Sequence, residues 1–380
     1  MTTNLTNSTN KVPNVPPLRF PEFTGEWEKK QLNHYAQKIT QKNKDNSVSN
    51  VLSNSATLGL IPQSDFFDRD IANKENTDGY YVIANNDFVY NPRKSATAPF
   101  GPINIYEGNE LGIISPLYLC FRAKGIQHKF LYYFFKSPAW YRYMYINGDS
   151  GARHDRVSIP DDFFFNLPLH VPNEKEQYKV AHFLDLLDTR IETQNKIIED
   201  LKTLKSAISA KLLHNSCWND MKIHEICHTL NYKQYIAKNI QETGEFPVIQ
   251  QGDNPICGYS HETPFDNYKN VLLFGDHTLS LYKPNSKFLL ATDGIKVLLP
   301  TGHIKRDFLY YLLEANMPKS EGYKRHYSIL KEVNVKVPPI EEQEKISGVF
   351  IAIDDKIALE QLLKSSYKTQ KAFLLQQMFI

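Results

Sequence analysis

An internal repeat is the sequence feature that most constrains the fold of this chain. Residues 171–180 align without a gap on residues 337–346, and both stretches carry the pattern Pro-x-x-x-Glu-Gln-x-Lys followed by Val or Ile. The offset of 166 residues holds for about forty residues, so that Asp188 falls on Asp354. A period of this length indicates that one structural unit is used twice.

Both repeated stretches have the pattern of a long amphipathic helix. Each begins with a proline and acidic residues, and apart from Gly348 neither contains an internal glycine or proline. At about 1.5 Å per residue, forty residues extend about 60 Å, which exceeds the core of a small domain. We therefore expect one helix within 170–215 and one within 337–380, packed antiparallel as a coiled coil about a pseudo-two-fold axis. The ungapped register disfavours the alternative of two unrelated helices in separate cores.

The seam between these helices should be formed by apolar residues at helical spacing. The expected seam residues are Val180, Leu184, Leu187, Ile191, Leu201, Ile208, Leu212, Ile346, Phe350, Ile353, Ile357, Tyr367, Leu374 and Met378.

The sequence before each helix repeats more loosely. Residues 130–135 resemble 308–313, and Gly151-Ala152-Arg153-His154 is answered by a similar stretch that ends in Arg325-His326. Short β-prone runs, separated by Gly, Pro and Asn-Asp turns, lie between these landmarks. We expect an α+β fold with two globular domains, 18–169 and 216–336, separated by the two helices and preceded by a disordered tail, 1–17.

Composition limits the classes of partner and compartment. Lys and Arg number 44 against 42 Asp and Glu, so the formal net charge of +2 provides no strong basic field, and any nucleic-acid contact must be local. No stretch approaches a membrane span or a signal peptide, so we expect a cytoplasmic protein without membrane contact. The four cysteines form no Cys-x-x-Cys pair and are expected to be free thiols, as in a reducing cytosol: Cys120, Cys217, Cys227 and Cys257.

One short motif suggests catalysis. His224-Glu225-Ile226-Cys227-His228 has the spacing of a zinc hydrolase, in which one helix face holds both imidazoles and the Glu acts as general base. A structural zinc site formed by Cys217, Cys227, His224 and His228 is the related alternative. Both are disfavoured, because the motif is short and no Cys-x-x-Cys anchor is present. The chain also lacks a phosphate-binding loop, a dinucleotide-binding Gly motif and an amino-methyltransferase motif, so we expect no catalytic residue, metal or cofactor in it.

Three features resemble the specificity subunit of type I restriction-modification systems: the opening Leu18-Arg19-Phe20-Pro21-Glu22-Phe23-Thr24-Gly25-Glu26-Trp27, the repeated Pro-x-x-x-Glu-Gln motif, and the late elements that begin with Gly and end in Arg-His. The resemblance implies a non-catalytic bacterial subunit with two target recognition domains that reads a bipartite, asymmetric sequence in double-stranded DNA. It also implies docking of two methyltransferase subunits and of restriction endonuclease/translocase subunits. S-adenosylmethionine, Mg and ATP are then expected on those partners.

Basic residues in turns are the best candidates for DNA contact, because their side chains reach phosphates and base edges. The candidates are Arg93, Lys94, Arg153, His154, Arg156, Lys283, Lys287, Lys324, Arg325 and His326. Arg153 and Arg325 stand out, because the repeat places them alike. The alternative function is a coiled-coil scaffold that binds partner proteins without DNA.

Overall fold

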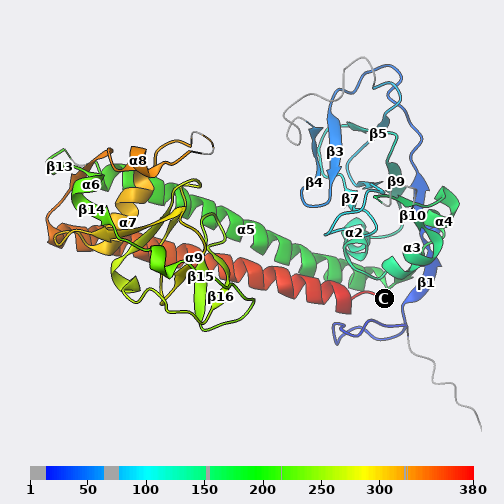
Figure 1. The fold of residues 1–380 in the computed structure, drawn as a ribbon. Helices are drawn as coiled ribbons and strands as arrows, with labels where there is room; N and C mark the ends of the chain where they lie inside the picture. Colours follow the sequence, from blue (N-terminus) through cyan, green and yellow to red (C-terminus); the bar gives the residue numbers. More distant parts are fainter. Residues whose placement is uncertain (1–13, 64–76, 151–154, 215, 321, 323) are drawn as a thin grey trace, which may run out of the picture. The chain divides into compact units, whose positions relative to one another are not determined.

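The structure is a computed structural model that describes residues 14–63, 77–150, 155–214, 216–320, 322 and 324–380 (Figure 1). The chain divides into two compact units. Unit 1 comprises the described residues of Met1–Thr193 together with Lys364–Ile380, and unit 2 comprises those of Gln194–Leu363. The boundary between the units therefore falls within both long helices.

The described part of unit 1 is built on two four-stranded sheets and two pairs of short strands, β1 (Glu28–Gln31) with β12 (Pro168–Val171) and β10 (Asp149–Ser150) with β11 (Val157–Ser158). The first sheet is antiparallel and has the order β2 (Ala36–Lys38), β9 (Leu119–Ala123), β6 (Asp87–Tyr90), β7 (Ile103–Ile105). The second has the order β4 (Gly59–Pro62), β3 (Val51–Ser55), β8 (Gly112–Ile114), β5 (Tyr81–Ile83). The remaining elements are η1 (Leu32–His34), α2 (His128–Lys136), α3 (Tyr141–Asn147) and α4 (Asp161–Phe165).

Unit 2 repeats this architecture. Its four-stranded antiparallel sheet has the order β14 (Cys227–Thr229), β20 (Ile295–Pro300), β17 (Leu272–Gly275), β18 (Leu281–Tyr282). A three-stranded sheet has the order β16 (Ile256–Ser260), β15 (Phe246–Ile249), β19 (Leu289–Leu290). The remaining elements are β13 (Asn219–Lys222), α6 (Ile223–Ile226), η3 (Lys233–Tyr235), η4 (Tyr268–Asn270), α7 (Arg306–Ala315), α8 (Tyr327–Leu330) and β21 (Asn334–Val337).

The four-stranded antiparallel sheet, the parallel strand pair and the antiparallel strand pair next to the long helix correspond in the two units. Ile39 N donates to Cys120 O at 2.8 Å in unit 1, and Leu230 N donates to Val297 O at 2.9 Å in unit 2. Each unit has one parallel strand pair, β3 with β8 and β15 with β19, and one antiparallel pair at its base, β1 with β12 and β13 with β21. The predicted α+β domain is thus present twice.

The two long helices are α5 (Glu174–Leu212) and α9 (Ile340–Gln377), which confirms the predicted pair. Within unit 1, Lys371 Nζ lies 2.5 Å from Asp188 Oδ1, and His170, just before α5, contacts Ile380 at the end of the chain. The two segments therefore run antiparallel there. Within unit 2, Lys205 pairs with Asp354 at 2.8 Å while Leu213 shares a core cluster with residues from the start of α9, which gives the same direction.

The predicted seam is buried or half-buried at every position. The sequence did not indicate that polar residues also occupy it. Gln194 and Glu360, which are related by the repeat, are only 8% and 4% exposed.

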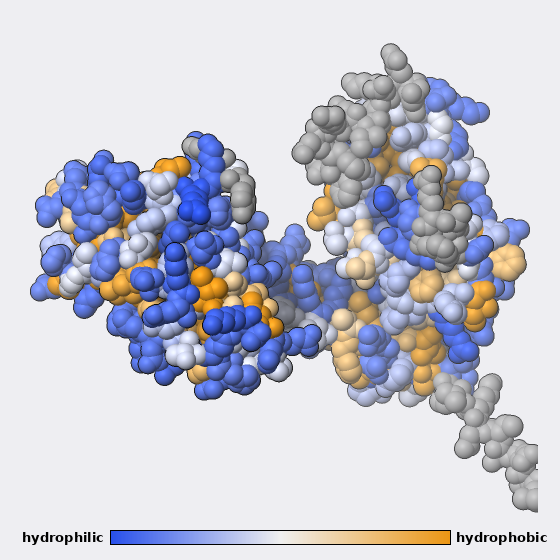
Figure 2. Space-filling view, in the orientation of Figure 1, coloured by the Kyte–Doolittle hydropathy of each residue, from blue (hydrophilic) through white to orange (hydrophobic). Residues whose placement is uncertain are grey.

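Aromatic side chains fill the core of unit 1, where Phe88, Phe121, Phe135, Trp140 and Phe164 are almost completely buried. Each such side chain stabilises the fold by roughly 1.5–3 kcal/mol through removal of apolar area from water. The visible face of both units is mainly hydrophilic, with hydrophobic residues in small groups (Figure 2).

The same polar contacts join helix and globule in both units. Gln177 Oε1 accepts from Gln127 N at 3.0 Å, and Gln343 Oε1 accepts from Lys305 N at 2.9 Å. Tyr133 donates to Asp188 at 2.8 Å in the first unit.

Tyr311 is the equivalent of Tyr133 in unit 2, and it donates to Asp354 at 2.9 Å. Burial raises the pKa of both phenols, and the neighbouring carboxylate raises it further, so the phenols remain donors. The glutamine of the repeated Glu-Gln motif and the Asp188/Asp354 pair thus anchor the long helices to the globules.

Candidate nucleic-acid interface

In unit 1 the fold brings together three predicted basic residues from two distant segments. Arg93 and Lys94 follow β6, and Arg156 precedes β11. A backbone bridge links Arg93 to Arg156, and Lys94 N donates to Asp155 O at 2.8 Å. Arg93 and Arg156 are exposed, and neither guanidinium forms an ion pair with a described residue.

These residues border a cavity of about 410 Å³. Its wall also contains Asn54, Asn91 and Tyr118. Burial raises the pKa of the Tyr118 phenol, while the charges of Arg156 and then Arg93 oppose that rise because both lie nearby.

The amides in this wall are held in place by hydrogen bonds. Asn54 Nδ2 donates to Val89 O at 2.8 Å, and Asn91 Nδ2 donates to Asn54 O at 3.1 Å. Asn91 Oδ1 accepts from Arg93 N at 3.0 Å, which fixes the turn that carries the arginine. The arrangement is a rigid polar cleft edged by guanidinium groups, which are suited to bidentate hydrogen bonding with guanine or phosphate.

Unit 2 contains an equivalent polar site, and its hydrogen bonds establish the correspondence. Val157 N donates to Pro92 O at 2.9 Å in unit 1, and His326 N donates to Asp276 O at 2.9 Å in unit 2. The residue before each donor is an arginine, so Arg325 corresponds to Arg156 and not, as the sequence repeat predicted, to Arg153. Arg325 is exposed, as Arg156 is.

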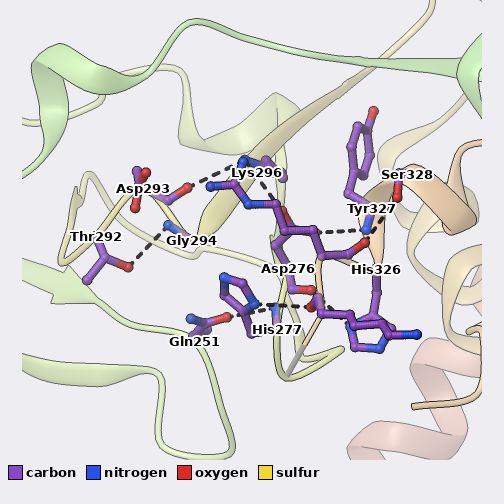
Figure 3. A network of polar contacts seen from close by, with 12 residues as sticks. Gln251, Asp276, His277, Thr292, Asp293, Gly294, Lys296, His326, Tyr327 and Ser328 are labelled. Atoms are coloured by element: carbon purple, nitrogen blue, oxygen red, sulfur yellow. Dashed lines mark hydrogen bonds and ion pairs between the residues drawn. The ribbon is translucent and has the colours of Figure 1, made fainter. Parts of the chain in front are cut away.

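In unit 2, the turn after β17 lies at the position that the turn after β6 has in unit 1. Gln251 Oε1 accepts from the backbone of His277 at 3.1 Å, and His277 Nδ1 lies 3.1 Å from Lys324 O (Figure 3). Strand pairing places His277 where unit 1 has Arg93, and Gln251 where unit 1 has Asn54.

A buried carboxylate supports the Arg325 segment. Asp276 Oδ1 accepts from Tyr327 N at 2.8 Å, and Asp276 Oδ2 lies 3.6 Å from Lys296 Nζ (Figure 3). The Asp276 side chain is 3% exposed, so these contacts satisfy an otherwise costly buried charge. The hydrogen bonds from His326 N and Tyr327 N to Asp276 therefore fix the backbone next to Arg325.

The structure changes the assignment of several predicted residues. His326 is wrong as a DNA contact, because it is completely buried, with Nδ1 3.1 Å from Asp276 O. Lys283 lies over the Tyr310 ring and pairs with Asp307 at 3.2 Å, so it belongs to the α7 packing. Lys287 pairs with Asp266 at 2.6 Å and is not among the residues assigned to the polar site.

Lys324 is exposed beside Arg325 and stays a prediction. Arg153 and His154 lie outside the described residues. Sequence reasoning missed His277, Gln251 and Tyr118, because their places follow from strand order and no motif marks them.

The zinc-hydrolase motif does not form. Helix α6 ends at Ile226, and His228 lies on β14, so the two imidazoles do not share a helix face. Glu225 accepts from Lys222 N at 2.5 Å as a cap of α6. Among the described residues, no group of three or more His, Cys, Asp or Glu side chains is placed to hold a metal.

Cys120, Cys227 and Cys257 are free thiols, as predicted. Burial raises the pKa of Cys120 and Cys227 to about 12, which keeps both as thiols. Within the described ranges, no helix is long and apolar enough to cross a membrane.

The fold and its repeated hydrogen-bond networks define a class of two-domain α+β proteins with a duplicated polar site and two long antiparallel helices. The sequence matches the family described as "Type I restriction modification DNA specificity domain" over residues 24–203 and 215–366. The chain therefore belongs to this family and is a specificity subunit of a type I restriction-modification system. A specificity subunit is not itself catalytic.

Solved structures show the same fold. The S subunit of a type I restriction-modification system from M. genitalium matches with a TM-score of 0.61 at 17% identity, covering 96% of this chain and 99% of that chain. A structure from work on complex assembly and conformational transition of the type I R-M system matches with a TM-score of 0.57 at 16% identity, covering 92% and 96%. A comparison with curated protein sequences gives no significant match.

Proposed function

We propose that each unit reads one half of a bipartite DNA target through its polar site, with Arg156 and Arg325 as the corresponding base contacts. The observation that carries this proposal is the equivalent placement of the two arginines by the hydrogen bonds of Val157 and His326. An arginine donates two hydrogen bonds to guanine O6 and N7, and one such pair contributes about 1–3 kcal/mol of discrimination.

The target is asymmetric, because the two polar sites present different side chains. Unit 1 offers Arg93 and Lys94 in the turn where unit 2 offers His277 and Thr278. These groups differ in charge and in hydrogen-bonding pattern, so they favour different base edges. Two similar modules with different side chains read two different half-sites in double-stranded DNA.

Catalysis belongs to partner chains in this proposal. Two methyltransferase subunits and endonuclease/translocase subunits bind the specificity subunit, and S-adenosylmethionine, Mg and ATP are bound by them. Exposed apolar side chains on the long helices support docking: Leu186 and Leu204 on α5 are 51% and 49% exposed, and Leu359 and Leu362 on α9 are 49% and 68% exposed.

A gel shift with the assembled methyltransferase complex tests the proposal. Binding should be sequence-selective and should weaken as salt rises, because phosphate contacts release counterions. Arg325→Ala should weaken binding to the cognate duplex, and Lys287→Ala, which removes a paired lysine, is the matched control. Equal affinity of the parent complex for cognate and scrambled duplexes would favour a scaffold without DNA recognition.

A further inference from the structure

Residues 14–26, the N-terminal arm, cover the start of α5 in unit 1. Arg19 donates from Nε and Nη2 to Glu176 Oε1 and Oε2, both at 2.7 Å. Trp27 Nε1 donates to Glu176 Oε1 at 3.1 Å. The Glu176 side chain is 1% exposed, so this is a buried bidentate ion pair with its remaining acceptor capacity used.

Further contacts fix the arm on the same surface. The Phe20 ring lies 5.6 Å from the Phe183 ring, edge to face, and Lys179 Nζ lies 4.7 Å from the Phe20 centroid. Lys179 also pairs with Glu22. The arm thus supplies an arginine, an adjacent aromatic ring and an acid three residues after the arginine.

Unit 2 repeats the receiving surface without an arm. The repeat places Glu342, Lys345 and Val349 at the positions of Glu176, Lys179 and Phe183. Trp218 before β13 stands where Trp27 stands before β1. Only residues 213–217 connect the end of α5 to Trp218, so unit 2 has no counterpart of the arm.

The uncovered surface forms a groove of about 580 Å³ at the start of α9. Its lining includes Trp218, Met221, Ile304, Ile340 and Glu342. The Glu342 side chain is 46% exposed, against 1% for Glu176. No described residue accepts a hydrogen bond from the Trp218 indole.

We propose that this groove docks an extended segment of a partner protein that carries an arginine followed by an aromatic residue and an acid, as the arm does. The arginine pairs with Glu342, and the aromatic ring covers Val349, which is 42% exposed. Lys345, now 2.7 Å from Glu342, moves to the acid of the incoming segment, as Lys179 pairs with Glu22. The acidic first turn of α9, with Glu341 and Glu342, complements the arginine.

The occupant is a different protein rather than a second copy of this chain. Each copy's arm is held by its own Glu176 and by a hydrogen bond from Leu18 N to Gln377 O at 2.9 Å. Releasing it would leave Glu176 as a buried charge without a partner, which is strongly unfavourable. A segment from another chain carries no such cost.

The test uses a fluorescent synthetic peptide with the sequence of residues 14–26 as the probe and the full chain as receptor, without DNA. Fluorescence anisotropy should show saturable one-to-one binding. Glu342→Lys should weaken it at least tenfold, whereas Glu341→Lys, which makes the same charge change on the same turn, should leave it within about twofold. A peptide with Arg19→Glu should bind the Glu342→Lys chain better than the parent chain.

Absence of saturable binding to the parent chain, or equal weakening by both lysine variants, would overturn the proposal. Self-association of the chain that disappears with Glu342→Lys would also overturn it, because the groove would then receive a second copy. Since no DNA is present, these results are independent of the two polar sites. Thermal unfolding of both variants confirms that they are folded.

Discussion

The two units share their strand order and the contacts that anchor the long helices, but they differ in the charged residues around these contacts. In unit 2, Lys205 pairs with Asp354 and with Glu314 of α7, both at 2.8 Å. In unit 1, Lys136 of α2 stands at the position of Glu314 and Lys371 at that of Lys205. Both lysines face the same carboxylate, Asp188.

The two polar sites differ in the same way, with Arg93 in unit 1 and His277 in unit 2. The helix anchors and strand order are therefore the invariant part of the repeat, and the charged groups around them are the variable part. Recognition of two different half-sites requires a repeated fold whose surface residues differ between the two copies.

The largest expected effect concerns the buried core residues that the two units share on their long helices. Leu184 and Phe350 are equivalent in the repeat and are 0% and 1% exposed, and the Phe350 ring lies 4.8 Å from that of Tyr311. Phe350→Ala should lower the free energy of unfolding by about 3–5 kcal/mol and Leu184→Ala by about 2–5 kcal/mol. Phe373→Ala, at a 57% exposed position, should change it by less than about 0.5 kcal/mol.

Hydrogen exchange followed by mass spectrometry localises these effects. Phe350→Ala should reduce protection in unit 2, and Leu184→Ala in unit 1. Equal loss of protection in both units from either variant would show that the two units do not have separate stabilities.

A smaller difference lies in pH dependence. Burial, and then the charge of Lys371, lower the pKa of Lys136 to about 8, although Asp188 opposes the change. The unfolded chain, with a lysine pKa of about 10.4, then binds more protons than the native state between about pH 8 and 10, so this lysine makes stability rise with pH in that window.

Lys136→Met should flatten this rise, measured by urea unfolding at pH 7.5, 8.5 and 9.5. Lys287→Met, at an exposed lysine, is the control and should keep the slope of the parent. An unchanged slope in Lys136→Met would show that Lys136 is not held in a desolvated site.

The smallest expected effect concerns the helix starts. Gln127 Oε1 accepts from Phe130 N at 2.5 Å at the start of α2, whereas Lys305 gives α7 no side-chain cap. Gln127→Ala should lower the free energy of unfolding by about 1 kcal/mol, and Lys305→Asn should raise it by up to about 1 kcal/mol. Thermal unfolding of the two variants checks the opposite signs, and shifts of the same sign would contradict them.

The long helices and their seam were predictable, because an ungapped register records a shared packing surface directly in the sequence. The polar sites were only partly predictable. Arg93 and Arg156 meet because β6 and β11 lie near each other in the fold, and no local pattern records that proximity. His326 lies beside Arg325 but points inward, so a basic run did not reveal which residue reaches solvent.

The zinc motif failed for a similar reason. Cys227 pairs with Pro300 in the sheet, and this strand pairing ends the helix before the second histidine. Tertiary pairing, which a short motif does not contain, decided the local structure there.

The central claim is that each unit reads its own half-site through corresponding arginines, and methylome sequencing of cells carrying the complex tests it most directly. Arg156→Ala should relax the base preference in one half of the methylated target, and Arg325→Ala should relax it in the other half, with the remaining half unchanged in each case. The same methylated sequence in both variants and the parent, or loss of preference in both halves from either change, would contradict the account.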